Sequence, residues 1–397
     1  MKTTNTAPGI DTADFYDYER LLTDAERGVL HGVRDFMTTE VQPVVLEHWS
    51  KSTFPFEIVP GFAALGIGGL PYRGYGCGGG SFLLDGMVAM ELARTDCSIA
   101  TFNGVHSGLA MGSIYLCGSD EQRERYLPAM ARFEKIGSFG LTEPEVGSGA
   151  SRGLQTTAER VGDTWILNGQ KKWIGNATFG DVTVIWARDI ADGEVKGFVV
   201  ENATPGFTVE KQQHKFALRI VQNGLITLSD VRVSEADRLQ GADSFAATAE
   251  VLRMTRAGVA WMAVGCARGA YENALAYACT REQFGRPIGG FQLVQDLLVR
   301  MLGNVTSSWG MCVRLSQLQD QGLAEDRHSS LAKAFCTARM RETVGWAREL
   351  MGGNGILLEH NVGRFVADAE AIYSYEGTRE MNTLIVGRAL TGLSAFV

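Results

Sequence analysis

A glutamate near the end of the chain, Glu376, is the first residue to consider for chemistry. It lies in the segment Tyr375-Glu376-Gly377-Thr378, between two stretches of helical pattern. A carboxylate shielded from water has a raised pKa and can accept a proton from carbon. Taken alone, the same four residues are more typical of a turn in which Thr378 caps the next helix. The catalytic interpretation therefore depends on what else the chain carries.

Two segments in the middle of the chain contain residues that suit a ligand site. Gly140-Leu141-Thr142-Glu143-Pro144, followed by Gly147-Ser148, is rich in small residues whose backbone N–H groups can approach a planar or anionic ligand. Trp173-Ile174-Gly175-Asn176 follows a β-rich run. Taken alone, the first segment is more commonly an ordinary connection between two elements. The tryptophan of the second is more commonly part of the core of a sheet.

Two more segments lie in the second helical part of the chain. One of them is Arg281-Glu282-Gln283-Phe284-Gly285, with Gln292 beyond it. An arginine between two helical stretches usually lies at a solvated helix end, but its guanidinium is also suited to bind phosphate. Met351-Gly352-Gly353-Asn354-Gly355 has the glycines of a helix C-terminus. Gly76-Cys77-Gly78-Gly79-Gly80 lacks the lysine of a phosphate-binding P-loop, and no Gly-x-Gly-x-x-Gly dinucleotide motif opens a helix.

Composition excludes several classes of function. The 397 residues are 45% hydrophobic with a net charge of -8, so a large core is possible and nucleic-acid binding is disfavoured. No apolar run reaches the length of a membrane span, and the polar N-terminus lacks the order of a signal peptide, so we expect a cytoplasmic protein. Seven cysteines without Cys-x-x-Cys pairs and six histidines without metal-binding spacing predict no metal site.

Three regions must position these residues, and they differ in their hydrophobic period. Residues 1–136 have a helical pattern, with Thr23 as an expected N-cap and a helix over residues 83–94. Residues 137–241 have short β-rich runs, and residues 242–397 return to long helical patterns. The sequence therefore predicts an α+β, mostly α-helical chain with three domains.

The β-rich runs predict the middle domain in more detail. They cover residues 164–167, 182–187, 197–201, 207–210 and 225–233. Asn168-Gly169 is a typical hairpin turn and predicts one between residues 165–167 and 171–173, while Pro205-Gly206 marks another turn. We expect a small antiparallel barrel or sandwich.

The order helical, β, helical, together with the motifs above, resembles the acyl-CoA dehydrogenase and oxidase superfamily from about residue 20 to the end. Within it the chain is most similar to glutaryl-CoA dehydrogenases and to plant short-chain acyl-CoA oxidases. The resemblance implies an N-terminal helical domain, a middle antiparallel β domain and a C-terminal four-helix bundle. It also implies FAD as cofactor, no metal, and a homotetramer in which each FAD site is completed by a neighbouring chain.

The resemblance assigns roles to individual residues. Glu376 is the expected catalytic base. The expected FAD-binding residues are Phe139, Leu141, Thr142, Ser148, Trp173, Ile174, Gly175, Arg281, Phe284, Gln292, Gly352, Gly353 and Thr378. The expected substrate-binding residues are Ser148, Arg256, Tyr375 and Gly377.

The implied reaction is the α,β-desaturation of a short-chain acyl-CoA in fatty acid β-oxidation. Glu376 would remove the C2 proton while a hydride passes from C3 to flavin N5. The electron acceptor is an electron-transferring flavoprotein or, in the oxidase alternative, O2 with release of hydrogen peroxide. A glutaryl-type decarboxylating enzyme, a flavin hydroxylase on the same fold and a non-catalytic scaffold are further alternatives, and Glu376 argues against the last two.

Three positions depart from the family pattern and bear on these alternatives. Ala100 stands where glutaryl enzymes have an arginine for the distal carboxylate, so we expect straight chains of roughly four to eight carbons, a range that rests on the resemblance. Gly175 stands where many relatives have a threonine, and we expect it to leave room for O2 beside the flavin. Gly149 replaces an aspartate in the loop near the flavin.

Overall fold

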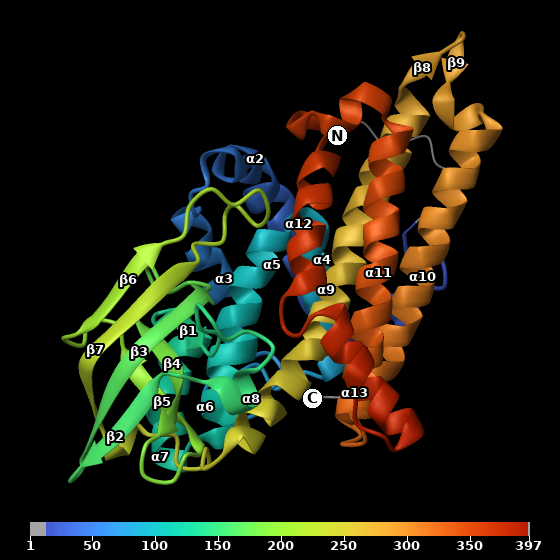
Figure 1. Cartoon of the computed structure of the whole chain (residues 1–397). Coiled ribbons are helices and arrows are strands. Elements are labelled where there is room, and N and C mark those ends of the chain that lie inside the picture. The colour runs from blue at the N-terminus through green and yellow to red at the C-terminus, as the bar shows by residue number, and fades with distance from the viewer. Residues whose placement is uncertain (1–12, 396–397) are drawn as a thin grey trace.

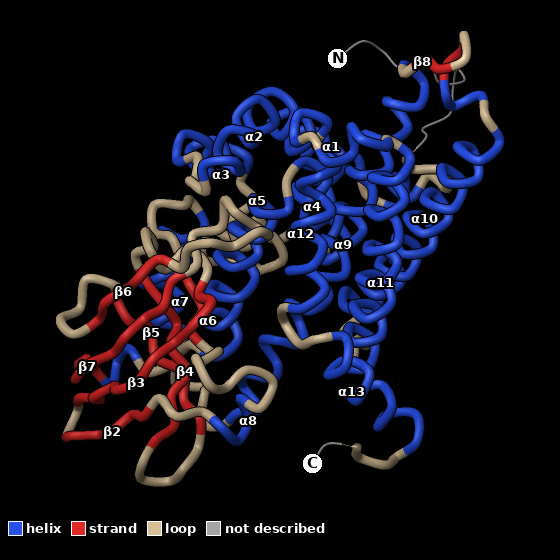
Figure 2. Tube along the Cα trace, turned by 45° about the horizontal axis from the view of Figure 1, so that its top comes forward, coloured by secondary structure: helices blue, strands red, loops and turns tan. Residues whose placement is uncertain are grey.

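A computed structural model describes residues 13–395 of the chain. The polar N-terminal residues 1–12 and the last two residues lie outside this range. Figure 1 shows a β-sheet on one side of the molecule, a set of long helices on the other, and α4 and α5 between them. In Figure 2 strands and helices form separate parts of the chain. Within the described range, no helix is long and apolar enough to cross a membrane.

The N-terminal helices begin where the sequence pattern places them. Thr23 caps the first helix and forms a reciprocal capping box with Glu26. The helix expected over residues 83–94 is α4, which spans Phe82–Thr95 and is capped by Ser81. The helices of this region are α1 (Asp24–Phe36), α2 (Gln42–Lys51), α3 (Val59–Leu65), α4, α5 (Cys97–Asn103), α6 (Gly112–Cys117) and α7 (Asp120–Ala131). A wider helical turn, Gly104–Met111, continues α5 into α6.

The middle region forms one seven-stranded sheet, and each of the five predicted runs lies in a strand. The strands are β1 (Gly137–Gly140), β2 (Thr157–Val161), β3 (Thr164–Ile174), β4 (Val182–Asp189), β5 (Val195–Glu201), β6 (Phe207–Lys211) and β7 (Gly224–Ser234), with a short helix α8 (Ala150–Gly153) after β1. Their order is β1-β4-β2-β3-β7-β6, and β5 pairs with β4. The sheet is not wholly antiparallel, because β1 and β2 both run parallel to β4.

The hairpin predicted at Asn168-Gly169 is wrong. Strand β3 runs through both residues, and the turn between β2 and β3 lies at Gly162-Asp163 instead. Asn168 bonds Asp230 on the neighbouring strand through both its amide and its carbonyl oxygen, at 3.0 and 2.8 Å. Gly169 has a φ of 146°, and a Cβ there would lie 2.6 Å from Thr156 Oγ1. The Asn-Gly pair therefore marks an irregularity within a strand, which turn statistics do not distinguish from a hairpin.

The C-terminal region consists of long helices and a short hairpin at one tip. It contains α9 (Phe245–Thr280), β8 (Glu282–Gln283), β9 (Arg286–Pro287), α10 (Gln292–Asp320), α11 (Asp326–Leu350), α12 (Val362–Ser374) and α13 (Arg379–Thr391). Helix α9 is buried along most of its length because α4, α10, α11 and α12 all pack against it. Figure 1 shows β8 and β9 at the end of the bundle that is farther from the sheet.

The two helical regions share one hydrophobic core although the sheet separates them in the chain. Residues from Leu22 to Ile372 contribute to the same buried cluster. Glycines allow α4 and α9 to approach closely, since a Cβ at Gly265 would lie 2.1 Å from the Met90 carbonyl oxygen. This close packing makes α4 and α9 two walls of the cleft beside Glu376.

Candidate active site

Glu376 lies in the short connection between α12 and α13. Its φ is +50°, and Gly377 follows with a φ of +84°. A left-handed backbone is uncommon for a residue with a side chain and persists where the surroundings hold it in place. Thr378 caps α13 by accepting a hydrogen bond from Met381 N at 3.3 Å, as the sequence suggests. The turn interpretation and the catalytic interpretation of this segment are thus both compatible with its structure.

A buried lysine on α11 holds this connection. The Lys333 ammonium donates hydrogen bonds to the carbonyl oxygens of Tyr373, Tyr375 and Gly377, which flank Glu376 on both sides. Burial lowers the pKa of Lys333 to about 7, and the Glu376 carboxylate opposes that shift. The three bonds fix the backbone that carries Glu376 and hold the Lys333 ammonium close enough to lower the pKa of the Glu376 carboxyl.

The Glu376 carboxylate is held by one side chain. Thr255 Oγ1 on α9 donates a hydrogen bond to Glu376 Oε2 at 2.9 Å. Burial raises the pKa of Glu376 above its usual range, while the Thr255 hydroxyl and the Lys333 and Arg256 cations partly counteract the rise. A carboxylate with a raised pKa is a stronger base once it has lost its proton.

Substituting Thr255 by valine should shift the acid side of the pH–activity profile to higher pH. Catalysis by a base requires Glu376 in its ionised form, and loss of the hydrogen bond that favours this form raises its pKa further. The profile of kcat/KM against pH measures the shift, and Thr280→Val at the exposed end of the same helix is the control. An unchanged acid limb would show that Glu376 does not control it.

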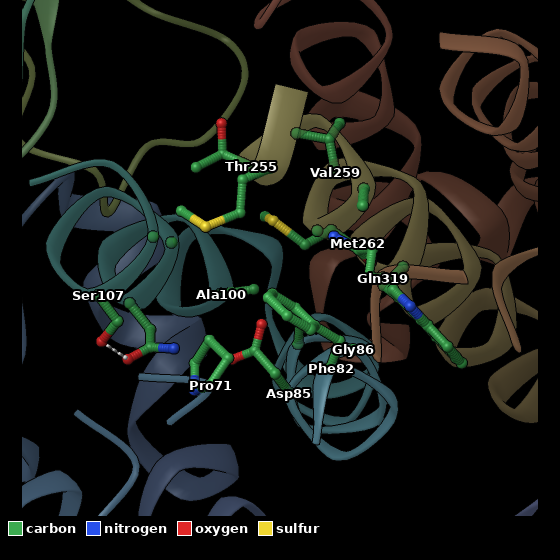
Figure 3. A pocket seen from close by; sticks show the side chains of 18 of the residues that line it. Pro71, Phe82, Asp85, Gly86, Ala100, Ser107, Thr255, Val259, Met262 and Gln319 are labelled. Atoms are coloured by element: carbon green, nitrogen blue, oxygen red, sulfur yellow. Dashed lines mark hydrogen bonds between the residues drawn. The ribbon is translucent and has the colours of Figure 1, made fainter. Parts of the chain in front are cut away.

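A cleft lies beside Glu376, with an empty volume of about 700 Å³ including its open mouth. Helices α4, α5 and α9 supply most of its walls, and Figure 3 shows Ala100 and Met262 between Thr255 on one side and Asp85 on the other. Much of the lining is apolar or small. The lining includes Tyr72, Asp85, Ala100, Met254, Thr255, Met262, Gln319 and Glu376. A cleft with this lining suits a short aliphatic chain with its reactive end at Glu376.

Arg256 and Tyr375, two of the four residues expected at the substrate, lie near Glu376 and outside the cleft lining. Arg256 Nη1 pairs with Asp326 and lies 3.3 Å from Ser330 Oγ, both on α11. Its Nε is buried without a hydrogen-bond partner in the described part of the chain. Tyr375 Oη donates to Met262 Sδ at 3.7 Å and so packs behind a cleft residue. The expected substrate contacts of both residues remain predictions.

The loop after β1 and the end of β3 form a second group of expected site residues. Lys171 Nζ donates to the Leu141 carbonyl oxygen at 3.1 Å and to Glu143 Oε1 at 2.8 Å, in a buried pair. Thr142 accepts a backbone hydrogen bond from Lys172 at 2.8 Å. These bonds fix the Leu141–Glu143 backbone against β3.

Three residues of the same group differ in exposure. Phe139 and Ile174 are buried, whereas Trp173 is 54% exposed in a left-handed conformation. Ser148 and Gly149 are exposed in the turn before α8. Trp173 is therefore not a residue of the sheet core, and the simpler interpretation of this tryptophan does not hold. An exposed indole beside an open, glycine-rich turn suits a planar anionic ligand such as a flavin dinucleotide.

Val105 bounds the space beside Gly175. A Cβ at Gly175 would lie 3.0 Å from Val105 Cγ2, so a side chain at this position would require the valine to shift by a few tenths of an ångström. The expectation that this glycine leaves room for O2 stays a prediction. The sequence did not reveal this neighbour because Val105 belongs to a distant helical segment.

The remaining flavin-binding candidates lie at the far tip of the bundle. Arg281 begins the β8–β9 hairpin, Phe284 at its turn is 92% exposed, and Gln292 opens α10. Gly352 and Gly353 are at the same end, since Asn354 Nδ2 donates to Tyr277 Oη near the end of α9 at 2.9 Å. Figure 1 places this tip at the end of the bundle away from the sheet, in which strand β3 ends at Trp173 and Ile174.

Sequence reasoning missed three residues of the site. Lys333 lies on the same face of α11 as the buried Thr337 and Met340. A lysine at a position of the helical period that is otherwise buried could have indicated its role. Asp85 likewise interrupts an otherwise apolar face of α4. Thr255 gives no signal, because its role depends on the position of Glu376 in space. Within the described residues no group of three His, Cys, Asp or Glu side chains is arranged to hold a metal ion.

Family models match nearly the whole chain. The N-terminal domain of acyl-CoA dehydrogenases matches residues 23–134, the middle domain matches residues 138–231, and the C-terminal domain matches residues 244–391. The three matches follow the order of the helical, β and helical regions described above.

Individual proteins are similar over their full lengths. A short-chain specific acyl-CoA dehydrogenase of Megasphaera elsdenii is 30% identical over 93% of this chain and 98% of its own. A glutaryl-CoA dehydrogenase of Mycobacterium smegmatis is 38% identical with a TM-score of 0.94, over 98% of this chain and all of the other. A glutaryl-CoA dehydrogenase from the same organism, solved in complex with FADH2, is 35% identical with a TM-score of 0.94 and the same coverage. On these matches, the chain belongs to the acyl-CoA dehydrogenase family.

Proposed function

We propose that this protein is an FAD-dependent enzyme that desaturates short-chain acyl-CoA thioesters between C2 and C3. The observation that carries the proposal is the position of Glu376, a half-buried carboxylate with a raised pKa at the wall of a mainly apolar cleft. Family membership and the relative solved with FADH2 support the cofactor.

Glu376 removes the proton from C2 of the thioester. The base needs its carboxylate ionised and aimed at the substrate, and Thr255 holds one of its oxygens at 2.9 Å. The Glu376 N–H donates no backbone hydrogen bond within residues 13–395, so it can donate one to the thioester carbonyl oxygen. Such a bond stabilises the negative charge that develops on that oxygen as the proton leaves.

FAD, when bound, supplies the acceptor for the C3 hydride at its N5. The exposed Trp173 and the backbone of Leu141–Glu143, fixed by Lys171, fit a flavin ring, and the exposed glycines near Ser148 fit its charged part. The apolar walls around Ala100 and Met262 exclude water from C2 and C3. The protein thereby orients two reacting carbons between a base and a cofactor.

The proposal is tested by mixing the purified yellow protein with butyryl-CoA in the absence of oxygen. Rapid loss of the oxidised flavin absorbance and formation of crotonyl-CoA are expected. A protein that contains no flavin, or whose flavin no acyl-CoA of four to eight carbons reduces, would contradict the proposal.

For the electron acceptor, we propose an electron-transferring flavoprotein, with O2 as the alternative. A Cβ at Gly175 would lie 3.0 Å from Val105 Cγ2, so the glycine alone gives little support for an oxygen channel there. After anaerobic reduction by butyryl-CoA, mixing with aerated buffer should reoxidise the flavin slowly, and an electron-transferring flavoprotein should accelerate it. Rapid reoxidation with stoichiometric peroxide would make the protein an oxidase.

We further propose a homotetramer in which FAD binds across two chains. Arg281 and the exposed Phe284 lie far from Trp173 of their own chain, so a partner chain is needed to bring the two groups together. Arg281→Ala should weaken FAD binding by at least about 10-fold, as expected for a lost guanidinium–phosphate pair, whereas Arg300→Ala on the exposed side of α10 should not. Sedimentation of a stable monomer with full FAD occupancy would refute the shared site.

A further inference from the structure

The cleft contains a carboxylate that the proposed reaction does not use. Asp85 on α4 lines the cleft on the side opposite Thr255, and Figure 3 shows its carboxylate directed into the space near Pro71. In the part of the chain that the structure covers, this carboxylate makes no hydrogen bond and no ion pair. Its oxygens are accessible from the cleft, since they are absent from the fully buried unpaired atoms.

The charges around Asp85 do not compensate it. Burial raises the pKa of Asp85 to about 7, and the nearby Asp320 on α10 raises it further. The other titratable groups that face it are Tyr72 from the loop before α4 and Glu376 across the cleft, and neither is a cation. From α9 the cleft receives Met254, Thr255 and Met262, which carry no charge.

A carboxylate in this position disfavours a plain hydrocarbon chain. An unpaired polar group costs free energy when an apolar ligand displaces its water. Leucine would fill the same volume without that cost, and the neighbouring residues Leu83 and Leu84 show that α4 accepts leucine. The Gln319 side chain also lines the cleft and adds a second polar group.

We propose that the preferred substrate is an acyl-CoA whose acyl chain carries a hydrogen-bond donor, a hydroxyl or an ammonium group, that binds to Asp85. This inference rests on the proposed function, since it places the thioester end of the chain at Glu376 and the donor across the cleft. Ala100 and Met262 contact the carbons between the two ends.

The test compares CoA thioesters that differ only at the end of the chain. For each length from four to eight carbons, kcat/KM is measured by flavin reduction for the plain, ω-hydroxy, ω-amino and ω-methoxy acyl-CoA. At one length or more, the hydroxy or amino compound should exceed the plain one by about 10-fold or more, as expected for a hydrogen bond to a charged group. The methoxy compound only accepts hydrogen bonds and should not gain.

Variants of Asp85 identify the residue that is responsible. Asp85→Leu should abolish the ratio between the donor-bearing and the plain compound, and the exposed Asp35→Leu on α1 is the matched control that should retain it. Asp85→Asn, which keeps shape and polarity, should lose the preference for the amino compound if the leucine variant does not fold. Comparison of kcat/KM for the hydroxy and the amino compounds shows whether a hydroxyl or an ammonium group is the preferred donor.

The outcomes separate this inference from the proposed function. One contrary result is that plain acyl-CoAs reduce the flavin while no donor-bearing chain is used more efficiently. Another is that methoxy chains gain as much as the donor-bearing ones. Either result would overturn the role of Asp85 and leave the proposed desaturase activity intact. A preference that survives Asp85→Leu would assign the donor to another residue. A flavin that none of these thioesters reduces would overturn both.

Discussion

Glu376→Gln should retain FAD and lose turnover by roughly two to four orders of magnitude, which is the usual contribution of a positioned general base. Glutamine has nearly the same shape and can still accept the hydrogen bond from Thr255 Oγ1. Lys333 binds backbone carbonyls on both sides of position 376, so the connection should keep its conformation. The amide cannot accept the C2 proton, and only the chemical step should therefore fail.

The measurement is the rate of flavin reduction by butyryl-CoA in rapid mixing, together with the flavin content of the purified variant. Glu380→Gln is the matched control, because Glu380 is exposed on the next helix and pairs with Arg379. Near-wild-type reduction by Glu376→Gln would move the base to another residue.

Glutaryl-CoA should be used at least about 100-fold less efficiently than butyryl-CoA, because an unpaired buried carboxylate costs several kcal/mol. Ala100 lines the cleft where a glutaryl-type enzyme is expected to carry an arginine. Asp85 lines the same cleft, and its ionised form, which dominates above its pKa of about 7, repels a second carboxylate. High structural similarity to a glutaryl-CoA dehydrogenase does not offset these two residues, because substrate choice depends on the side chains of the site.

Values of kcat/KM for the two thioesters, measured with the same artificial acceptor, test this expectation. The double variant Ala100→Arg with Asp85→Leu should raise the glutaryl value relative to the butyryl value, since it adds a cation and removes a like charge. Equal wild-type efficiency on both substrates would refute the assignment.

The family motifs singled out Glu376, which the structure places at the wall of the cleft, and β-rich runs located the strands. Strands β3 and β7 show largely alternating burial, whereas β4 and β5 are short runs buried along nearly their whole length, and both patterns are visible in the residues themselves. The helices have caps whose residue types are equally visible, as at Thr23. These features depend on neighbours within a few positions, so the sequence contains them directly.

Features that depend on distant neighbours were not predictable in this way. Asn168-Gly169 has the composition of a turn, and only its pairing with Asp230 places it inside a strand. The space beside Gly175 depends on Val105. Lys333 has no local partner either, and its role depends on three carbonyls some forty residues further along the chain. Each case is a contact between elements, which no local pattern encodes.

The shared core of α4 and α9 also bears on how the chain folds during synthesis. The N-terminal helices leave the ribosome first, but the face of α4 that approaches Gly265 has no partner until the whole sheet and most of α9 have followed. Pairings between residues so distant in sequence form slowly and leave apolar surface exposed in the meantime. The sheet, whose strands pair within one region, can fold earlier. The nascent chain therefore depends most on protection by chaperones while the middle region is being made.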